Sequence, residues 1–234
     1  MTAGFISSFQ SLGTVDGPGV RYVVFLQGCP LRCKCCHNPE TWGIGKGDSY
    51  SADEIAARVS RYRNYFGSDG GITISGGEPL LQAEFVAEVF RLCKAQGIST
   101  CLDTSGCILD DAVQRVLDHT DLVLLDYKMT NEADYFSFSG MHLQQAERFL
   151  RNLNDRHIPT WLRQVILCGI NDTNENISAL FQKQQQYDCI RNIELLPFRK
   201  LCTAKYEQLG IPFPLAHIPE TPKSRIDELL GALS

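Results

Sequence analysis

The sequence predicts an α/β protein in which a parallel sheet, covered by helices, forms a partial (β/α)6 barrel of the TIM type. Three observations lead to this fold class. Strand-like and helix-like segments alternate along the 234 residues, the strand-like segments are strongly apolar, and a polar or cysteine-containing segment follows most of them. Apolar strands are typical of a parallel sheet that is buried on both faces. About six strand–helix units are too few for a closed eight-unit barrel, in which functional residues follow the strands.

Local patterns predict the individual elements. Residues 21–26 (RYVVFL) are β-branched and aromatic, which favours a strand. Residues 51–65 open with a capping box from Ser51 to Glu54 and place apolar side chains on one helical face. The same criteria predict strands at 71–75, 99–104, 122–126, 161–167 and 192–196, and helices at 80–96, 110–119, 143–156, 174–186 and 223–233. The Pro-rich segment 203–221 is predicted to be a loop.

Length and composition indicate one soluble domain spanning residues 1–234. The chain is 44% hydrophobic and 21% charged, which is ordinary for a globular protein. Its net charge of −5 argues against a nucleic-acid partner bound by a basic face. No apolar run is long enough to span a membrane, and residues 1–10 lack the pattern of a secretory signal. We therefore expect a cytoplasmic protein without a membrane or nucleic-acid partner.

Ten cysteines are the unusual feature of the composition. In the reducing cytosol, clustered cysteines indicate metal ligation or redox chemistry rather than disulfides. Cys29, Cys33 and Cys36 form a Cys-x3-Cys-x2-Cys motif directly after the strand at 21–26. Three thiolates at this spacing can hold three irons of a cubane cluster and leave the fourth iron open to a small molecule with amino and carboxylate groups. Zinc fits less well, because no second pair of ligands is apparent.

The remaining cysteines are interpreted as free thiols that hold no second cluster. Adjacent side chains on a tight loop point in different directions, so Cys35 is expected to be a small buried side chain rather than a fourth ligand. The other six lack ferredoxin spacing, which argues against a second cluster. They are Cys93, Cys101, Cys107, Cys168, Cys189 and Cys202.

Longer motifs surround the cysteine motif. The run DGPGVR (16–21) precedes it, and GGEP (76–79) follows the next predicted strand. Together with LDTSG (102–106), LDYK (125–128) and IELLP (193–197), the chain resembles the radical S-adenosylmethionine (SAM) enzymes. More narrowly, it resembles the activating enzymes of glycyl-radical enzymes, and among them those of the pyruvate formate-lyase type. The resemblance covers most of the chain and implies a radical SAM core.

The resemblance implies an oxidoreductase that installs a radical in another enzyme. In this family a reduced [4Fe–4S] cluster cleaves SAM to methionine and a 5′-deoxyadenosyl radical. That radical abstracts hydrogen from a glycine of a partner enzyme such as pyruvate formate-lyase, generating its glycyl radical. The family further implies flavodoxin or ferredoxin as electron donor and an anaerobic cytoplasmic setting, and we expect a monomer. Only fourteen residues separate Cys36 from Ser51, too few for the ferredoxin-like insertion of some other activating enzymes.

The resemblance also implies which residues hold the cluster and the methionyl end of SAM. Cys29, Cys33 and Cys36 are the cluster ligands and the catalytic set. Gly76 and Gly77 let the main chain approach the methionyl amino group, because neither has a Cβ. Glu78 either supports that loop or places a negative charge at a helix N-terminus, where it interacts favourably with the helix dipole. Arg163 lies near the methionyl carboxylate, for which a guanidinium is well suited.

Further SAM contacts follow from the same resemblance. Cys35, Cys36 and His37 border the adenine. Asp126, Tyr127 and Lys128 lie toward the ribose and the sulfonium.

Two more implied sites involve carboxylates. Asp103 and Thr104 offer oxygen ligands for a monovalent cation near the cofactor. Asp16 either binds the incoming glycine loop or serves as a turn-forming residue before Gly-Pro.

The chain departs from the family pattern at three positions. Cys35 replaces an aromatic residue, Arg199 a histidine and Cys202 a glycine. Arginine does not shed its proton near neutral pH, but Arg199 can still bind a carboxylate of the cofactor. Because these departures lie near the cofactor and the substrate, they bear on which partner is activated more than on the radical chemistry itself.

Other functions remain open at the level of sequence. A radical SAM enzyme acting on a small molecule would not need the segment 16–19. A non-catalytic iron–sulfur electron carrier would normally have four cysteine ligands and would bind no SAM. A zinc-binding interaction module is a third alternative, which the presence of zinc without labile sulfide would support.

Overall fold

The computed structural model describes residues 2–231. By their contacts these residues divide into two compact units. Unit 1 comprises residues 2–30 and 41–124, and unit 2 comprises residues 31–40 and 125–231. The division passes through the cysteine motif, so Cys29 belongs to unit 1 whereas Cys33 and Cys36 belong to unit 2. That the units form one domain stays a prediction.

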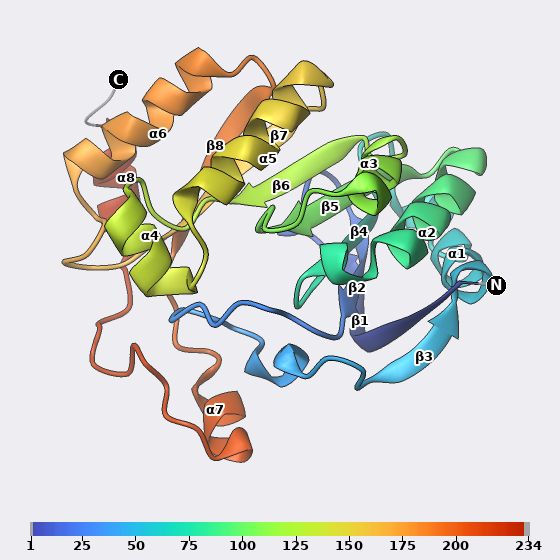
Figure 1. Cartoon of the computed structure of the whole chain (residues 1–234), viewed down its shortest axis with the longest axis horizontal. Coiled ribbons are helices and arrows are strands. Elements are labelled where there is room, and N and C mark those ends of the chain that lie inside the picture. Colours follow the sequence, from blue (N-terminus) through green and yellow to red (C-terminus); the bar gives the residue numbers. More distant parts are fainter. Residues whose placement is uncertain (1, 232–234) are drawn as a thin grey trace. The chain divides into compact units, whose positions relative to one another are not determined.

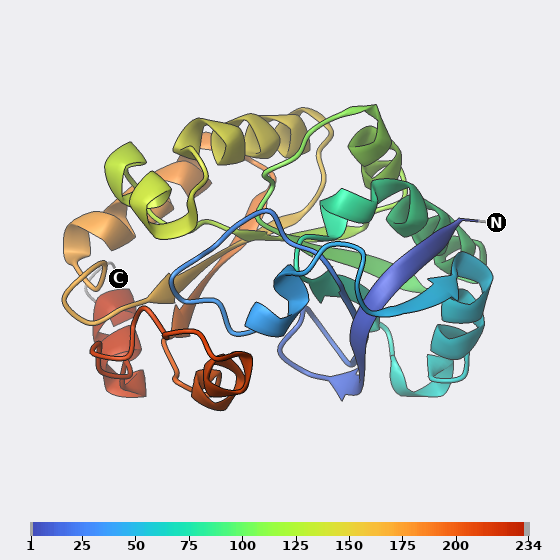
Figure 2. The ribbon, with the colours of Figure 1, turned by 60° about the horizontal axis from the view of Figure 1, so that its bottom comes forward.

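Unit 1 is built on a sheet of mostly parallel strands. In pairing order these are β3 (Asp48–Ser51), β1 (Ala3–Gly13), β2 (Arg21–Leu26), β4 (Gly71–Gly76) and β5 (Ser99–Thr104), followed by β6 (Leu122–Asp126). β2, β4 and β5 run parallel, whereas β1 is antiparallel to β2 and to β3. Figure 2 shows β1 and β3 side by side. Val23, Val24 and Leu26 of β2 are fully buried, as expected for a strand covered on both faces.

Helices and short 3₁₀ turns accompany this sheet. The helices are α1 (Ala52–Ser60), α2 (Ala83–Ala95) and α3 (Asp111–Leu117), and the 3₁₀ turns are η1 (Pro39–Trp42), η2 (Arg63–Tyr65) and η3 (Pro79–Gln82). α2 packs against both α1 and α3 (Figure 1). The predicted capping box of α1 is present, since the Ser51 hydroxyl accepts from Glu54 N at 3.3 Å and Ser51 N donates to the Glu54 carboxylate at 2.7 Å.

Unit 2 has its own strands and helices. Its strands are the end of β6, β7 (Thr160–Ile166) and β8 (Ile190–Pro197), and its helices are α4 (Glu132–Ser139), α5 (Leu143–Asp155), α6 (Asn174–Gln186), α7 (Thr203–Leu209) and α8 (Lys223–Gly231). β7 and β8 are parallel. α4 packs on α5, and α6 packs against β8 (Figure 1). α5 buries Ala146, Phe149, Leu150 and Leu153, at the spacing of one helical face.

The predicted α/β class with parallel strands is confirmed. The predictions at 21–26, 99–104, 122–126 and 174–186 coincide with β2, β5, β6 and α6. The predicted helix 80–96 begins as the 3₁₀ turn η3, because Pro79 and Glu78 set a tighter first turn. The last predicted helix corresponds to α8, and its residues 232 and 233 lie outside the described residues.

The sequence patterns miss β1, β3 and α4. β1 alternates buried and exposed side chains clearly only near its start, and β3 has four residues, so neither gives a sustained periodic signal. α4 is rich in Ser and aromatic residues, which are weak helix formers. It is fixed instead by its ends, where Asn131 caps the first turn and Gly140 adopts a φ of 77°.

The loop prediction for 203–221 is wrong at its start, because residues 203–209 form α7. The side chain of Tyr206 is 1% exposed, so tertiary burial stabilises a helix too short to show a clear period in the sequence. None of the described helices combines the length and the apolar composition needed to cross a membrane.

Candidate active site

In unit 1, Gly76 at the end of β4 and Gly77 directly after it allow close contact with the end of β2. A Cβ on Gly76 would lie 2.2 Å from Leu26 N, and a Cβ on Gly77 would lie 2.1 Å from Gly28 O. Gly76 also has a φ of 118°, which side-chain-bearing residues rarely adopt. The main chains are joined there by hydrogen bonds from Gly77 N to Leu26 O and from Glu78 N to Gly28 O. The Gly-Gly pair therefore serves strand packing beside Cys29.

The carboxylate of Glu78 ties this turn to the segment after β5. Glu78 is 1% exposed. It accepts hydrogen bonds from the Thr104 hydroxyl at 2.6 Å, from Ser105 N at 3.0 Å and from the Ser105 hydroxyl. It also accepts from Leu80 N at 3.1 Å, at the start of η3. The carboxylate thus takes part in both predicted arrangements, since it holds the loop and also caps the first turn of η3.

The two predicted cation ligands both lie in unit 1 and have protein partners. The Ser75 hydroxyl donates to Asp103 at 2.7 Å. The Thr104 hydroxyl donates to Glu78 and accepts from Gly106 N at 3.0 Å. The two residues are adjacent at the end of β5, where Asp103 is half-buried and Thr104 is buried.

Asp16 lies before β2 in unit 1, in a segment fixed by a buried arginine. Asp16 O accepts from the Thr73 hydroxyl at 2.7 Å, and the same hydroxyl accepts from Arg21 Nε at 3.1 Å. Arg21 is fully buried and also donates to Ile72 O at 2.6 Å. Burial lowers the pKa of Arg21 from its ordinary value. The DGPGVR motif thus has a structural role of its own, beside any contact with a partner.

Main-chain hydrogen bonds fix the loop segment that carries Cys29. Gly28 N donates to Thr41 O at 2.7 Å, and Cys29 N lies 3.4 Å from Trp42 O. The Cys29 side chain is half-buried. All ten cysteines of the chain carry thiols.

In unit 2, the loop with Cys33, Cys35 and Cys36 forms a tight turn. Cys36 N donates to Cys33 O at 3.0 Å, and Lys34 N donates to Phe138 O at 2.9 Å. The Tyr206 hydroxyl donates to Cys36 O at 3.2 Å. α4 and α7, which the sequence patterns do not predict, are therefore the elements that hold this loop.

The side chains of the turn differ in their surroundings. Cys35 is 6% exposed, as expected for a small buried side chain, whereas Cys33 and Cys36 are half-buried. Burial raises the pKa of the Cys33 thiol to about 11, and the positive charge of Lys128 opposes the rise. Burial raises the pKa of Cys35 still further. Of Cys33 and Cys35, Cys35 is therefore the less suited to deprotonate and bind a metal.

Four charged side chains gather in unit 2, two at the end of β6 and two in the middle of the paired strands β7 and β8. The Lys128 ammonium lies 2.6 Å from the Asp126 carboxylate, and Arg163 Nε lies 2.9 Å from the Glu194 carboxylate. Arg163 and Glu194 are direct partners in the register of β7 and β8. Burial would raise the pKa of Asp126, but Lys128 and Arg163 together bring it below its ordinary value. The structure thus brings three predicted residues, Asp126, Lys128 and Arg163, into one cluster.

Tyr127 points into the core of unit 2. It is fully buried, and its hydroxyl donates to Glu147 of α5. Its ring meets that of Tyr135 edge-on with 5.8 Å between centroids. The side chain is therefore used in packing α4 and α5, and the prediction that it faces the ribose gains no support.

His37 and Arg199 are neighbours in unit 2. His37 Nε2 lies 2.9 Å from Arg199 O, which favours the tautomer with hydrogen on Nε2. The Arg199 guanidinium donates to Thr221 O at 2.8 Å and lies 3.8 Å from the Glu220 carboxylate. Arg199 therefore contacts His37 through its main chain and the segment before α8 through its side chain.

Several residues of these arrangements were not singled out by the sequence. Ser105 and Glu194 lie inside motifs that carry the family resemblance, which is the signal that can find them. Tyr206 lies outside those motifs, and only the folded structure connects it to the cysteine loop. Within residues 2–231, no three His, Cys, Asp or Glu side chains lie close enough together to hold a metal ion, so the ligand assignment depends on the motif.

Comparison with known sequences places the chain in a family. The sequence model of the Radical SAM superfamily matches residues 23–181. The pyruvate formate-lyase-activating enzyme of Staphylococcus epidermidis is 41% identical over 226 residues, covering 93% of this chain and 90% of the relative. The enzyme of that name from Clostridium pasteurianum is 40% identical, over 98% of this chain and 96% of its own. Pyruvate formate-lyase 1-activating enzyme of Escherichia coli is 36% identical, over 98% and 95%.

Solved structures agree in fold. A domain of pyruvate-formate lyase-activating enzyme from Bacteroides vulgatus has a TM-score of 0.57 at 22% identity, covering 70% of this chain and 92% of that one. Streptococcus suis SuiB bound to S-adenosylmethionine has a TM-score of 0.61 at 15% identity, covering 74% of this chain and 39% of that one. At such identities the likeness concerns the fold alone. From the sequence relatives and the superfamily match together, the chain belongs to the radical SAM superfamily and, within it, to the family of the pyruvate formate-lyase-activating enzymes.

Proposed function

We propose that this chain is a radical SAM activase that generates the glycyl radical of a pyruvate formate-lyase-type enzyme. The observation that carries the proposal is the identity of 36–41% with activating enzymes over nearly the whole chain. The Cys-x3-Cys-x2-Cys motif, which this chemistry needs, is retained in the chain.

Cys29, Cys33 and Cys36 are the proposed ligands of a [4Fe–4S] cluster. Their donor set fits this group, because soft thiolates suit iron–sulfur clusters and the three side chains are half-buried thiols. When bound, the cluster supplies the electron that cleaves SAM to methionine and a 5′-deoxyadenosyl radical, which takes a hydrogen atom from the partner's glycine. Lys128 favours the thiolate of Cys33 by its positive charge.

The protein's own residues bind and orient SAM. We assign the methionyl carboxylate to Arg163, whose guanidinium pairs with Glu194 and attracts Asp126. Asp126 and Lys128 lie in the same charged cluster, which supports their assignment to the ribose and sulfonium side.

The amino group and the adenine are assigned to other segments. Gly76 and Gly77 present main-chain groups to the amino group, on a turn that Glu78 fixes. His37 lies two residues from Cys35 in a turn joined to Arg199, which supports a role for this segment beside the adenine. Asp16 remains the proposed contact for the glycine loop.

The remaining assignments follow the family. Asp103 and Thr104 are proposed to contribute oxygen ligands to a monovalent cation. We propose an oxygen-sensitive, cytoplasmic monomer that receives its electron from flavodoxin or ferredoxin.

Anaerobic reconstitution tests the proposed function. The protein is loaded with iron and sulfide, mixed with SAM and dithionite, and assayed for 5′-deoxyadenosine. Cys33→Ala should abolish product and cluster, whereas the control Cys93→Ala, at a fully buried position of α2, should retain both. A fully loaded cluster that yields no 5′-deoxyadenosine, with or without a partner enzyme, would favour an electron carrier instead.

A further inference from the structure

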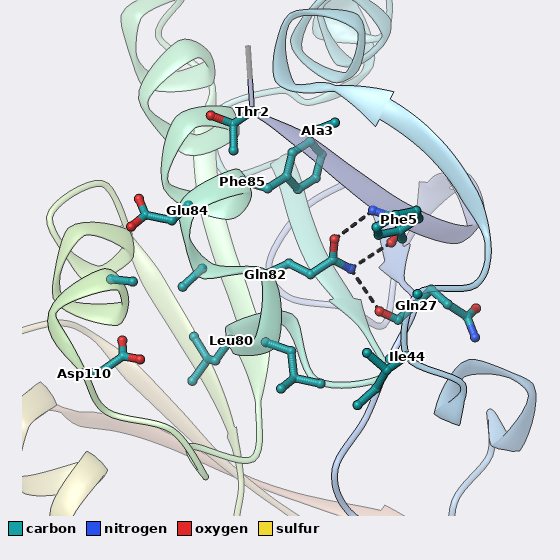
Figure 3. A pocket seen from close by; sticks show the side chains of 15 residues that line it. Thr2, Ala3, Phe5, Gln27, Ile44, Leu80, Gln82, Glu84, Phe85 and Asp110 are labelled. Atoms are coloured by element: carbon teal, nitrogen blue, oxygen red, sulfur yellow. Dashed lines mark hydrogen bonds between the residues drawn. The ribbon is translucent and has the colours of Figure 1, made fainter.

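The side chain of Gln82 joins three main-chain groups of unit 1. Its Oε1 accepts from Phe5 N at 2.7 Å, and its Nε2 donates to Phe5 O and to Gln27 O, both at 2.9 Å (Figure 3). The two-way exchange with Phe5 repeats the pattern of a residue pair in an antiparallel ladder. Phe5 lies one residue before the register shift of β1 and β2, which falls between Ile6 and Ser8. Its carbonyl also accepts from Gln27 N at 2.9 Å. The carboxamide therefore reinforces the existing main-chain contact between Phe5 and Gln27 and binds the carbonyl of Gln27.

Helix capping does not account for this glutamine. Gln82 occupies the N-cap position of α2, but its side chain makes no capping hydrogen bond there. That position favours Ser, Thr, Asp or Asn, whose short side chains reach the first-turn amides. The longer carboxamide instead reaches a different strand and the segment that leads to the cysteine motif.

The main chain just before Cys29 depends on such a support. Gly28, between Gln27 and Cys29, has a φ of 99°. A glycine is free to adopt many conformations, so the direction of the Cys29 thiol depends on what fixes the peptide groups on either side. Gln82 fixes the carbonyl of Gln27, and Thr41 O accepts from Gly28 N at 2.7 Å.

Gln82 lines a pocket, so we expect the protein to fold when this side chain is replaced. The pocket has a volume of about 450 Å³, and Leu80, Leu81 and Ile44 are among its lining residues (Figure 3). Gln82 is half-buried there. Water can therefore reach the groups that a substitution leaves unpaired, which keeps the cost below that of a fully buried hydrogen bond.

We propose that Gln82 is a positioning residue for the cluster ligand Cys29. Its carboxamide holds the carbonyl of Gln27 against β1 and so limits the rotation of the main chain at Gly28. The proposal rests on the function proposed above, in which Cys29 binds the cluster. It extends that function by assigning the loop's rigidity to a side chain that touches neither cluster nor substrate.

Gln82→Glu is the sharpest test. The substitution keeps the size of the side chain and the oxygen that faces Phe5 N, but it removes the donor to Phe5 O and Gln27 O. The matched control is Asn171→Asp. Asn171 also bridges two main-chain groups with its carboxamide, accepting from Leu167 N at 2.7 Å and donating to Val165 O at 2.9 Å. It lies outside the cysteine motif.

Three measurements are made on each reconstituted protein under anaerobic conditions. They are the rate at which a chelator bleaches the iron–sulfur absorbance, the electron paramagnetic resonance (EPR) spectrum of the reduced cluster with and without SAM, and the melting temperature. Gln82→Glu should lose its cluster about tenfold faster than the unsubstituted protein. That factor corresponds to the free energy of about one hydrogen bond that orders the loop. Its spectrum should change, whereas Asn171→Asp should lower the melting temperature and leave both cluster readouts unchanged.

The outcomes separate this inference from the proposed function. If the unsubstituted protein assembles no cluster, both the proposed function and the inference about Gln82 are wrong. If it assembles a cluster and Gln82→Glu matches it in bleaching rate and spectrum, the inference alone is wrong. If Asn171→Asp changes both cluster readouts as much as Gln82→Glu, the effect is one of general stability, and the inference is again wrong. If Gln82→Glu fails to fold, Gln82→Met, which removes every hydrogen bond of the carboxamide, takes its place. It should then show the faster cluster loss and the changed spectrum, and a cluster that matches the unsubstituted protein in both would make the inference wrong.

Discussion

Lys128 Nζ donates to the Asp126 carboxylate at 2.6 Å, just after β6. Burial by itself would lower the pKa of Lys128, but the charge of Asp126 outweighs burial and raises it well above its ordinary value. The pKa of Asp126 is correspondingly lowered. Both groups are therefore charged near neutral pH, and each stabilises the other in a partly dehydrated site.

Lys128→Met should destabilise the protein by about 2 kcal/mol at pH 7. The remaining Asp126 carboxylate loses its hydrogen-bonded partner, although Arg163 still attracts it. The cost is below the roughly 3–5 kcal/mol of a fully buried pair, because 33% of the Asp126 side chain is exposed. Urea unfolding measures the change. In the double variant Lys128→Met, Asp126→Asn the loss should be smaller than the sum of the two single losses; strict additivity would show that the two side chains do not interact.

The pair also predicts a dependence of stability on pH. Because the folded-state pKa of Asp126 is lowered, its contribution is present above the ordinary aspartate pKa, about 3.9, and is lost as the pH falls through the folded value. Because the pKa of Lys128 is raised, its contribution is lost only as the pH rises through that raised value. The difference in unfolding free energy between the unsubstituted protein and Asp126→Asn should be constant from about pH 5 to 9 and narrow in acid. A constant difference down to about pH 2 would contradict the lowered pKa.

Glu78→Gln should cost about 2 kcal/mol of stability, the scale of a lost hydrogen bond to a buried charge. The amide nitrogen would face donors, because the Glu78 carboxylate accepts from Thr104, Ser105 and Leu80. Thr104→Val, which removes one of these donors and keeps the shape, is the comparison and should cost less. Denaturant unfolding checks both, and an unfolding free energy equal to that of the unsubstituted protein in Glu78→Gln would mean that the network contributes nothing.

Gly77→Ala should be severely destabilising, by more than about 3 kcal/mol, because the new Cβ would lie 2.1 Å from Gly28 O. Gly45→Ala provides the control. Gly45 has a φ of 71° and nothing within 4 Å of its added Cβ, so it should show only the strain of a left-handed residue, about 1 kcal/mol. Thermal unfolding of both variants compares the cost of steric crowding in Gly77→Ala with the cost of backbone strain in Gly45→Ala. Equal losses would show that the close approach of β4 to β2 can relax.

Strands and helices with strong local signals could be predicted from the sequence. β2 and β6 contain short apolar runs, and α1 carries its capping box in Ser51 and Glu54. β1 and β3 could not be predicted, because a strand with Ser and Gln on much of its length is stabilised by pairing with distant residues. α7 likewise depends on burying Tyr206.

For the candidate site, motifs predicted the residues but not their partners. The pairing of Arg163 with Glu194 depends on the register of β7 and β8, which local sequence does not encode. The sequence placed Tyr127 with its neighbours Asp126 and Lys128, yet adjacent side chains leave a strand on opposite sides, and Tyr127 enters the core. Gln82 reaches Gln27 across 55 positions of the chain, a contact that only the fold creates.

The most direct test of the account is EPR detection of a glycyl radical in a purified pyruvate formate-lyase. The reconstituted protein is incubated anaerobically with that enzyme, SAM and a reductant. The proposed function predicts a radical on the partner that requires SAM, Cys33 of this chain and the partner's target glycine, with 5′-deoxyadenosine formed alongside. If SAM is cleaved at a fully loaded cluster but neither pyruvate formate-lyase nor a related glycyl-radical enzyme acquires a radical, the chain is not an activase, and a small-molecule substrate would have to be sought instead.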